Sequence, residues 1–163
     1  MPLESIEVSA TVPASPDEVW ALWMSTKGHS AFTGAAAVIA PQAGHRHTAW
    51  DGYIHGWVLK VGPGRRATFA WRTSEFAPSD VDSLVFLTVA RAPGGARVRL
   101  EHIEIPEGQG ARYRQGWDEF YVQPLLRHLA ATRRPTAKKK PVVAKKPAAK
   151  ARATTPTSRR ARG

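Results

Sequence analysis

Apolar and polar residues alternate over residues 6–12 (IEVSATV), where Ile and Val occupy most of the apolar positions. This period of two predicts a β-strand. Helical spacing follows at once: Ser15 suits an N-cap, Pro16 suits the first helical position, and Glu18 completes a capping box. We therefore expect a short helix directly after the first strand.

Residues 35–105 contain six short apolar segments separated by turn-forming residues. The separators PQAG, DG, GPGR, APSD and APGG are rich in the residues that tight turns require. Gly28 and Gly34 predict further turns just before this region. Short spacing of this kind favours hairpins, and so an antiparallel sheet. The expected strands are AAAVIA (35–40), RHTAW (46–50), YIHGWVLKV (53–61), ATFAWR (67–72), SLVFLTVA (83–90) and ARVRLEHIEI (96–105).

A long helix is predicted from about residue 110 to residue 131, because aromatic and apolar residues recur there every three or four positions. At a rise of 1.5 Å per residue such a helix would be roughly 33 Å long. Pro124 removes one backbone donor and should kink the helix. We expect this helix to lie across the concave face of the sheet.

The composition changes abruptly after Thr132. Residues 133–163 hold 12 of the 24 Lys and Arg residues and no acidic residue, which leaves residues 1–132 with 12 basic and 13 acidic residues. Of the net charge of +11, the C-terminal segment therefore contributes +12 and residues 1–132 contribute −1. That segment has no aromatic residue and cannot bury enough apolar surface to offset its ordering entropy. We expect one domain at residues 1–132 and a disordered tail at residues 133–163.

The chain has no cysteine, which excludes disulfides, thiolate metal sites and cysteine nucleophiles. The N-terminal stretch MPLESIEVSATVP carries acidic residues where a signal peptide would be basic. The longest apolar runs are far too short to span a bilayer. These features predict a soluble, cytoplasmic protein without a membrane partner, and association with the nucleoid through the tail stays open.

The stretch GHRHTAWDGYIHG (44–56) carries three histidines and an aspartate, so it first suggests a metal site. Asp51-Gly52, however, predicts a two-residue type I′ turn. Pairing counted outward from that turn places His55 on one face of the hairpin, and His45 and His47 on the other. Ligands divided between two faces make a poor zinc site, so no metal is predicted.

Four motifs resemble those of the family related to the C-terminal domain of the activator of the Hsp-ninety ATPase, within the SRPBCC/START superfamily. They are GHSAFTG (28–34), AWDGYIHG (49–56), FAWR (69–72) and GWDEFYVQPLLRHL (116–129). The resemblance covers about residues 4–130. It implies a single-domain α+β helix-grip fold, with a curved antiparallel sheet of about six or seven strands around a long C-terminal helix. A short helix pair is implied after the first strand.

The superfamily resemblance also implies a cavity between sheet and helix that takes apolar ligands, and aromatic residues suit its walls. Trp20, Trp23, Trp71 and Trp117 occupy strand or helix positions that would be buried in any case, so a core role is favoured for each of them over a role in binding. The phase of residues 53–61 is ambiguous, and a bulge near Gly56 would change it. Whether His55 faces the cavity therefore stays open. The candidate pocket residues are Trp50, Tyr53, His55, Trp57, Trp71, Tyr113, Trp117 and Tyr121.

No GxSxG, HExxH, P-loop or GxGxxG motif occurs, and Glu101 and Glu104 lie on opposite faces of a strand. His102 shares a face with Glu104 and is interpreted as part of a surface contact. We expect no catalytic residue and no cofactor, and a domain that binds an apolar small molecule or a protein partner. Two alternatives stay open: a co-chaperone-like partner of a bacterial Hsp-ninety ATPase, implied only by resemblance, and an enzyme acting on a ligand in the cavity.

The tail resembles the Lys-Ala-Pro tails of linker histones and bacterial histone-like proteins. Prolines keep such a chain extended, and lysines meet phosphates without reading bases, so sequence-nonspecific contact with DNA or RNA is expected. A solubilising tail, or one that touches anionic lipid or ribosomal RNA, is the alternative. The candidate nucleic-acid residues are Lys138, Lys139, Lys140, Lys145, Lys146, Lys150, Arg152, Arg159, Arg160 and Arg162.

Deleting residues 133–163 should abolish salt-sensitive DNA binding, because the remaining chain is nearly neutral. If roughly 6–10 cations of the full chain engage phosphates, its affinity should fall about 10³–10⁵-fold between 50 and 200 mM salt. Fluorescence anisotropy with a labelled duplex measures both effects. Salt-sensitive binding retained by the truncated chain would contradict the assignment of this contact to the tail.

Overall fold

The computed structural model describes residues 2–133, which form a six-stranded antiparallel sheet with helices on one side of it. The strand order is β1-β6-β5-β4-β3-β2. The predicted α+β helix-grip fold is confirmed. The predicted tail, apart from its first residue, lies outside the described residues. The elements are β1 (Leu3–Val12), α1 (Pro16–Trp23), α2 (Thr26–Thr33), β2 (Arg46–Ala49), the 3₁₀ turn η1 (Trp50–Gly52), β3 (Ile54–Gly62), β4 (Arg66–Thr73), β5 (Ser83–Ala92), β6 (Gly95–Pro106), α3 (Gly110–Trp117), the π-helical turn η2 (Asp118–Val122) and α4 (Gln123–Thr132).

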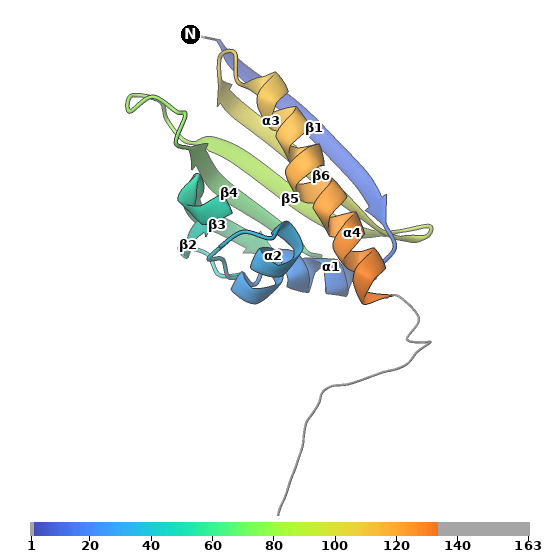
Figure 1. Ribbon diagram of the computed structural model, residues 1–163. Helices are drawn as coiled ribbons and strands as arrows, with labels where there is room; N and C mark the ends of the chain where they lie inside the picture. Colours follow the sequence, from blue (N-terminus) through green and yellow to red (C-terminus); the bar gives the residue numbers. More distant parts are fainter. Residues whose placement is uncertain (1, 134–163) are drawn as a thin grey trace, which may run out of the picture. The chain divides into compact units, whose positions relative to one another are not determined.

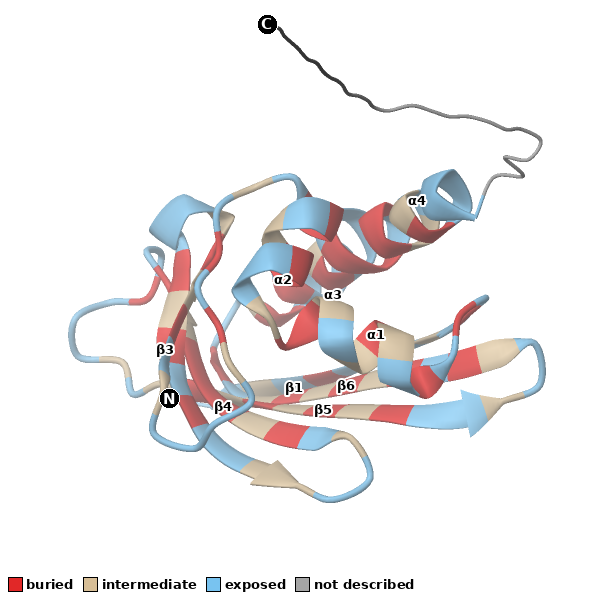
Figure 2. Ribbon diagram, turned by 90° about the horizontal axis from the view of Figure 1, so that it is seen from below, coloured by how far each residue is buried: buried red, intermediate tan, exposed pale blue. Residues whose placement is uncertain are grey.

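The C-terminal helix crosses the concave face of the sheet, as Figure 1 shows. Alternate residues of β5 and β6 point toward it, and Figure 2 shows the buried positions gathered between the two layers. Leu87 and Leu100 from the sheet, and Leu125 and Leu129 from the helix, are almost fully buried. Each such side chain contributes roughly 1.5–3 kcal/mol when it leaves water. No helix among residues 2–133 is both long and apolar enough to cross a bilayer.

The start of the C-terminal helix is held by the first strand. Both carboxylate oxygens of Glu4 accept hydrogen bonds of 2.7 Å, one from the Gly108 N–H and one from the Gly110 N–H. These bonds lower the pKa of the Glu4 carboxyl. They also satisfy donors that the helix end would otherwise leave without partners, since the side chain of Gln109 forms no cap.

A π-helical turn interrupts this helix just before Pro124. The backbone N–H of Gln123 donates to the carbonyl of Asp118, five residues earlier. Pro124 has no N–H to donate to the carbonyl of Phe120. The wider π-helical turn therefore accommodates Pro124, the residue at which the sequence predicts a kink. The widened turn carries Phe120 and Tyr121, which both reach the cavity described below.

Two short helices follow β1, as the resemblance implied. Ser15 accepts a hydrogen bond of 3.1 Å from the Glu18 N–H, so the predicted cap is confirmed. Gly34 ends α2 with a φ of 81°. Gly28, however, lies inside α2 and does not form the predicted turn. A Cβ atom at Gly28 would lie 2.6 Å from the Leu22 carbonyl oxygen, so glycine allows α2 to pack against the end of α1.

The predicted strand at residues 35–40 is wrong. Only Val38 pairs with the sheet, through two hydrogen bonds of 2.9 Å with Thr48. The N–H groups of Ala37 and Ile39 instead donate to the side chains of Ser30 and Thr26, at 3.1 and 3.0 Å. Because α2 supplies these acceptors, the apolar segment needs no continuous strand partner.

The predicted hairpin register is confirmed, with Thr48 opposite His55 and Ala49 opposite Ile54. Asp51 has φ 59° and ψ 29°, and Gly52 has a φ of 94°. These angles are those of a type I′ turn. The Tyr53 N–H closes the turn by donating to the Trp50 carbonyl at 3.1 Å.

The inward face of β3 is the one that carries Ile54, Gly56 and Val58, all of which are buried. The register of β3 shifts between Val58 and Lys60, so the bulge lies beyond the predicted position near Gly56. His55 lies between the inward-facing Ile54 and Gly56, so its side chain points away from the concave face. The phase that the sequence left open is thus resolved by Ile54 and Val58.

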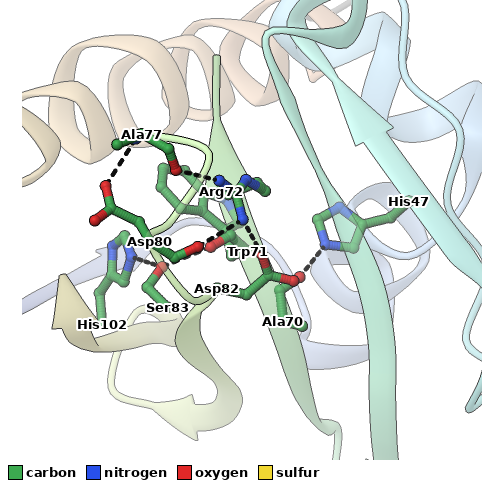
Figure 3. A network of polar contacts seen from close by, with 9 residues as sticks. All are labelled: His47, Ala70, Trp71, Arg72, Ala77, Asp80, Asp82, Ser83 and His102. Carbon is green, nitrogen blue, oxygen red and sulfur yellow. Dashed lines mark hydrogen bonds and ion pairs between the residues drawn. The ribbon is translucent and has the colours of Figure 1, made fainter. Parts of the chain in front are cut away.

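Gly56 allows a buried histidine to reach across a strand. His47 on β2 donates from Nε2 to the Ala70 carbonyl on β4 at 3.0 Å (Figure 3). The bond passes over Gly56 on β3, the strand between them. A Cβ atom at Gly56 would lie 1.8 Å from the Ala70 oxygen and 3.1 Å from His47 Nε2. Any side chain at this position would therefore break the bond between His47 and β4.

Replacing Gly56 by alanine should lower the free energy of unfolding by about 1–3 kcal/mol, because the new methyl group overpacks the sheet. Gly116→Ala is the matched control. A Cβ atom at Gly116 meets only Phe120, at 3.9 Å, and alanine favours a helix by about 1 kcal/mol over glycine. Urea denaturation of both variants measures the difference. Equal stability of the two variants would contradict this account of Gly56.

Candidate ligand-binding cavity

A cavity of about 450 Å³ lies between the tip of the β2–β3 hairpin, the end of β4 and the inner side of α3 and η2. Its walls are mostly aromatic, and its volume falls within the range of small-molecule sites. The residues that line it are Trp50, Tyr53, Ile54, Trp71, Glu75, Arg112, Tyr113, Gly116, Trp117, Phe120 and Tyr121.

Six of the eight predicted pocket residues line this cavity, namely Trp50, Tyr53, Trp71, Tyr113, Trp117 and Tyr121. His55 and Trp57 lie elsewhere, on the opposite face of β3, which corrects their predicted position. Trp57 is 44% exposed, and the guanidinium of Arg46 lies 5.5 Å from the centre of its ring. In residues 2–133 no group of three His, Asp or Glu side chains lies close enough together to hold a metal ion.

The floor of the cavity is a packed cluster of aromatic rings. The ring of Trp71 meets Tyr113 edge-on at 5.0 Å and lies 5.6 Å from Trp117. Trp117 lies 4.8 Å from Tyr121, which in turn stacks on Trp23 at 5.1 Å. Each such pair contributes about 0.5–1.5 kcal/mol beyond its buried area, so the rings keep fixed positions.

The buried His102 on β6 joins the helix residue Trp117 to the sheet. Figure 3 shows His102 with its partner Ser83 beside Trp71. The Trp117 indole N–H donates to His102 Nδ1 at 3.1 Å, so the imidazole proton must lie on Nε2. His102 Nε2 then donates to Ser83 Oγ at 2.8 Å, and the Ser83 hydroxyl donates to the Trp71 carbonyl at 2.7 Å. The interpretation of His102 as a surface contact is wrong, because its side chain is fully buried.

This arrangement keeps His102 neutral and fixes its tautomer. Burial lowers the pKa of His102 to about 3. Ser83 and His102 do not form a nucleophile and its base, because the imidazole nitrogen that faces Ser83 already carries a proton. Their geometry serves to hold Trp117 against the sheet.

His29, from the GHSAFTG motif, fixes the next aromatic residue of the helix. Its Nδ1 donates to the Trp23 carbonyl at 2.8 Å, so its Nε2 accepts from the Tyr121 hydroxyl at 3.0 Å. Burial lowers the pKa of His29 to about 4 and raises the pKa of Tyr121. Two neutral histidines thus hold Trp117 and Tyr121, which lie one helical turn apart.

Polar residues surround the more exposed part of the cavity. Tyr53 donates to the Glu75 carboxylate, which also forms an ion pair with Arg112. The Tyr113 hydroxyl donates to Gln109 at 2.5 Å, and burial raises the pKa of both tyrosines. Since the lining cation and anion neutralise each other, the cavity suits an uncharged molecule.

The β4–β5 loop carries Glu75 and is held by the arginine of the FAWR motif. Arg72 donates to the Ala77 carbonyl at 3.0 Å and forms an ion pair of 2.8 Å with Asp82 (Figure 3). The guanidinium also lies 5.2 Å from the centre of the buried Phe76 ring. Arg72 therefore fixes the loop that supplies one side of the cavity.

Sequence reasoning missed Ile54, Glu75, Arg112, Gly116 and Phe120 as lining residues. Phe120 follows Trp117 at helical spacing, which was a usable indication. Glu75 and Arg112 lie 37 positions apart and meet only in the folded chain. Nothing in their local sequence marks them.

The family model described as "Activator of Hsp90 ATPase homolog 1-like protein" matches residues 13–130. The chain belongs to this family. A human member, "Activator of 90 kDa heat shock protein ATPase homolog 1", is 25% identical over 123 residues. That match covers 76% of this chain but only 36% of the human protein, so the chain spans about a third of the length of this curated relative.

Solved structures of other proteins share the family's fold. A protein from Mesorhizobium loti is 23% identical and superposes with a TM-score of 0.67, over 79% of this chain and 98% of its own. An HSP90 activator from Plasmodium falciparum is 16% identical, also with a TM-score of 0.67, over 77% of this chain and 96% of its own. At these identities the likeness extends to the fold alone.

The buried histidines predict a loss of stability in acid. His29 and His47 have pKa values lowered from 6.5 to about 4, and His102 to about 3, mainly through burial. Unfolded histidines take up protons below about pH 6.5. Their contribution to the free energy of unfolding is therefore complete above pH 6.5 and is lost as the pH falls toward 4, by about 1 kcal/mol per pH unit for each histidine.

His102→Gln should reduce the slope of the free energy of unfolding against pH by the contribution of one histidine. The reason is that the variant takes up one proton fewer on unfolding. Urea denaturation between pH 7.5 and 4.5 measures the slope for both proteins. Parallel pH profiles for the variant and the wild type would show that His102 is not buried in its neutral form.

Proposed function

We propose that the domain binds a flat, apolar small molecule in the cavity between the hairpin tip and the C-terminal helix. The observation that carries this proposal is a formed cavity of about 450 Å³ with predominantly aromatic walls. Aromatic walls recognise flat apolar rings through stacked and edge-on contacts. Binding sites for small molecules are usually formed before the ligand arrives.

The packing around the cavity supports this proposal. Hydrogen bonds to His102 and His29 fix Trp117 and Tyr121, which are both at most 5% exposed. Gly116 contributes no side chain to the space beside them. Because the rings are fixed and Gly116 has no side chain, the protein itself does not fill the cavity.

Gly116→Leu should abolish ligand binding without unfolding the domain. A Cβ atom at residue 116 meets only Phe120, at 3.9 Å, and the rest of the side chain would occupy the cavity. Native mass spectrometry of protein purified from its own host should show a bound molecule on the wild type and none on this variant. Leucine also favours a helix by about 1 kcal/mol over glycine, so stability should not fall through helix propensity.

Gln115→Leu is the matched control, because residue 115 is exposed on the same helix and does not line the cavity. This variant should carry the same molecule as the wild type. A bound molecule on Gly116→Leu, or none on the wild type, would count against the cavity as the binding site.

A second candidate function is an interaction with an Hsp90-type chaperone ATPase. It is favoured by membership of the family and by the human and Plasmodium falciparum relatives whose names describe such activators. Because this chain spans only about a third of the human protein, the activity of the whole relative does not transfer directly.

The ATPase rate of the Hsp90-type chaperone from the same host should rise when the full chain is added. Gly116→Leu should raise it equally if docking uses a surface outside the cavity. A coupled ATPase assay measures both rates. An unchanged rate at saturating protein would contradict the chaperone candidate and leave the cavity proposal intact.

The tail would add a third property to the domain, namely sequence-nonspecific association with nucleic acid and so with the nucleoid. Its ten candidate Lys and Arg residues lie outside the described residues, and this part of the proposal rests on their composition alone. Catalysis on a molecule in the cavity stays an alternative. It would have to use scattered lining residues such as Tyr53, Glu75 and Arg112.

A further inference from the structure

We propose that Trp50, at the hairpin tip, selects the ligand. Its indole ring rotates and its N–H donates a hydrogen bond to an acceptor on a flat, apolar molecule. This inference rests on the proposed function and names the chemical class of the ligand. The molecule would be a planar polycycle that bears an uncharged acceptor such as a ring carbonyl. Four features of Trp50 and its surroundings lead to this conclusion.

The first feature is the backbone of Trp50. Its φ is 53°, in the left-handed region that bulky residues rarely adopt. Non-glycine residues in this region gather at ligand clamps and switch regions, where the surrounding structure imposes the conformation. Here the type I′ turn at Asp51-Gly52 lies directly after Trp50. The hairpin tip therefore holds Trp50 in a conformation that its own backbone disfavours.

The second feature is the indole N–H of Trp50, which is buried without a hydrogen-bond partner. It lies near the Tyr121 hydroxyl and lowers the pKa of that group against the larger, raising effect of burial. It does not reach ordinary hydrogen-bond geometry, however. Buried N–H groups nearly always have a partner, so the present position of this indole is poorly stabilised.

The third feature is the position of Trp50 in the cavity wall, next to an exposed side chain. Trp50 lies in the cavity wall and meets Phe120 edge-on, with ring centres 5.4 Å apart. Phe120 is 51% exposed, so water already reaches the ring on that side. A rotation of the indole would thus displace an exposed side chain and leave the buried floor of the cavity intact.

The fourth feature is the state of the other donors around the cavity. Each tyrosine hydroxyl in the wall already donates a hydrogen bond: Tyr53 to Glu75, Tyr113 to Gln109 and Tyr121 to His29. Arg112, whose side chain is exposed, is paired with Glu75 through Nη1. An acceptor on the ligand finds no free hydroxyl proton in this wall, whereas the N–H of Trp50 gains its missing partner from that acceptor.

The test uses two probes of the same shape, 9-fluorenone with a ring carbonyl and fluorene without one. Both should bind the full chain, and fluorenone should bind more tightly, by about three- to tenfold for one net hydrogen bond. Trp50→Phe keeps an aromatic wall and should abolish this preference. In ¹H–¹⁵N spectra of the wild type, the Trp50 indole proton should shift downfield with fluorenone and not with fluorene.

The outcomes separate this inference from the proposed function. Binding of both probes with equal affinity, and an indole proton that responds alike to both, would overturn the role of Trp50 and leave the cavity as a binding site. Failure of both probes to bind the wild type, with no bound molecule on protein from its host, would overturn both proposals. The spectra of the wild type decide the matter even if Trp50→Phe does not fold.

Discussion

The hydrogen bond from the Trp117 indole to His102 joins the two layers of the domain and positions the C-terminal helix on the sheet. A buried imidazole is stabilising only when both nitrogens have partners, and here the sheet supplies one and the helix the other. Burial keeps the ring neutral. The bond from the Trp117 indole leaves the imidazole proton on Nε2, where Ser83 accepts it. The bond therefore sets both the height and the rotation of the helix above the sheet. His29 repeats the arrangement one turn further along, through Tyr121.

A cavity persists beside this junction because the surrounding rings cannot move into it. Trp71, Trp117 and Tyr121 are held on several sides by other rings or by the two histidines. Gly116 leaves space on the helix, while Arg72 fixes the loop that supplies Glu75. Trp50 is the exception among the wall residues, since its backbone is strained and its N–H has no partner. The rigid part of the wall thus gives the cavity its shape, while Trp50 selects the ligand.

Much of this fold follows from the sequence, because strand and helix periods are local properties. The Asp51-Gly52 turn was sufficient to fix the register of the whole hairpin. Residues 35–40 have the pattern of a strand, but two of their backbone N–H groups donate to side chains of α2 and not to a neighbouring strand. The sequence does not indicate that His102 is buried, because its partners Ser83 and Trp117 are distant from it along the chain. The polar residues of the cavity were missed for the same reason, since Glu75 and Arg112 come from a loop and a helix that meet only on folding.

A neutral His102, protonated on Nε2, joins the sheet to the helix. The ¹⁵N chemical shifts of its ring measure this directly in the folded protein. We expect a protonated Nε2 and an unprotonated Nδ1, unchanged from pH 7.5 down to pH 5, with a hydrogen bond from the Trp117 indole proton to Nδ1. An imidazolium in that range, or a proton on Nδ1, would contradict it.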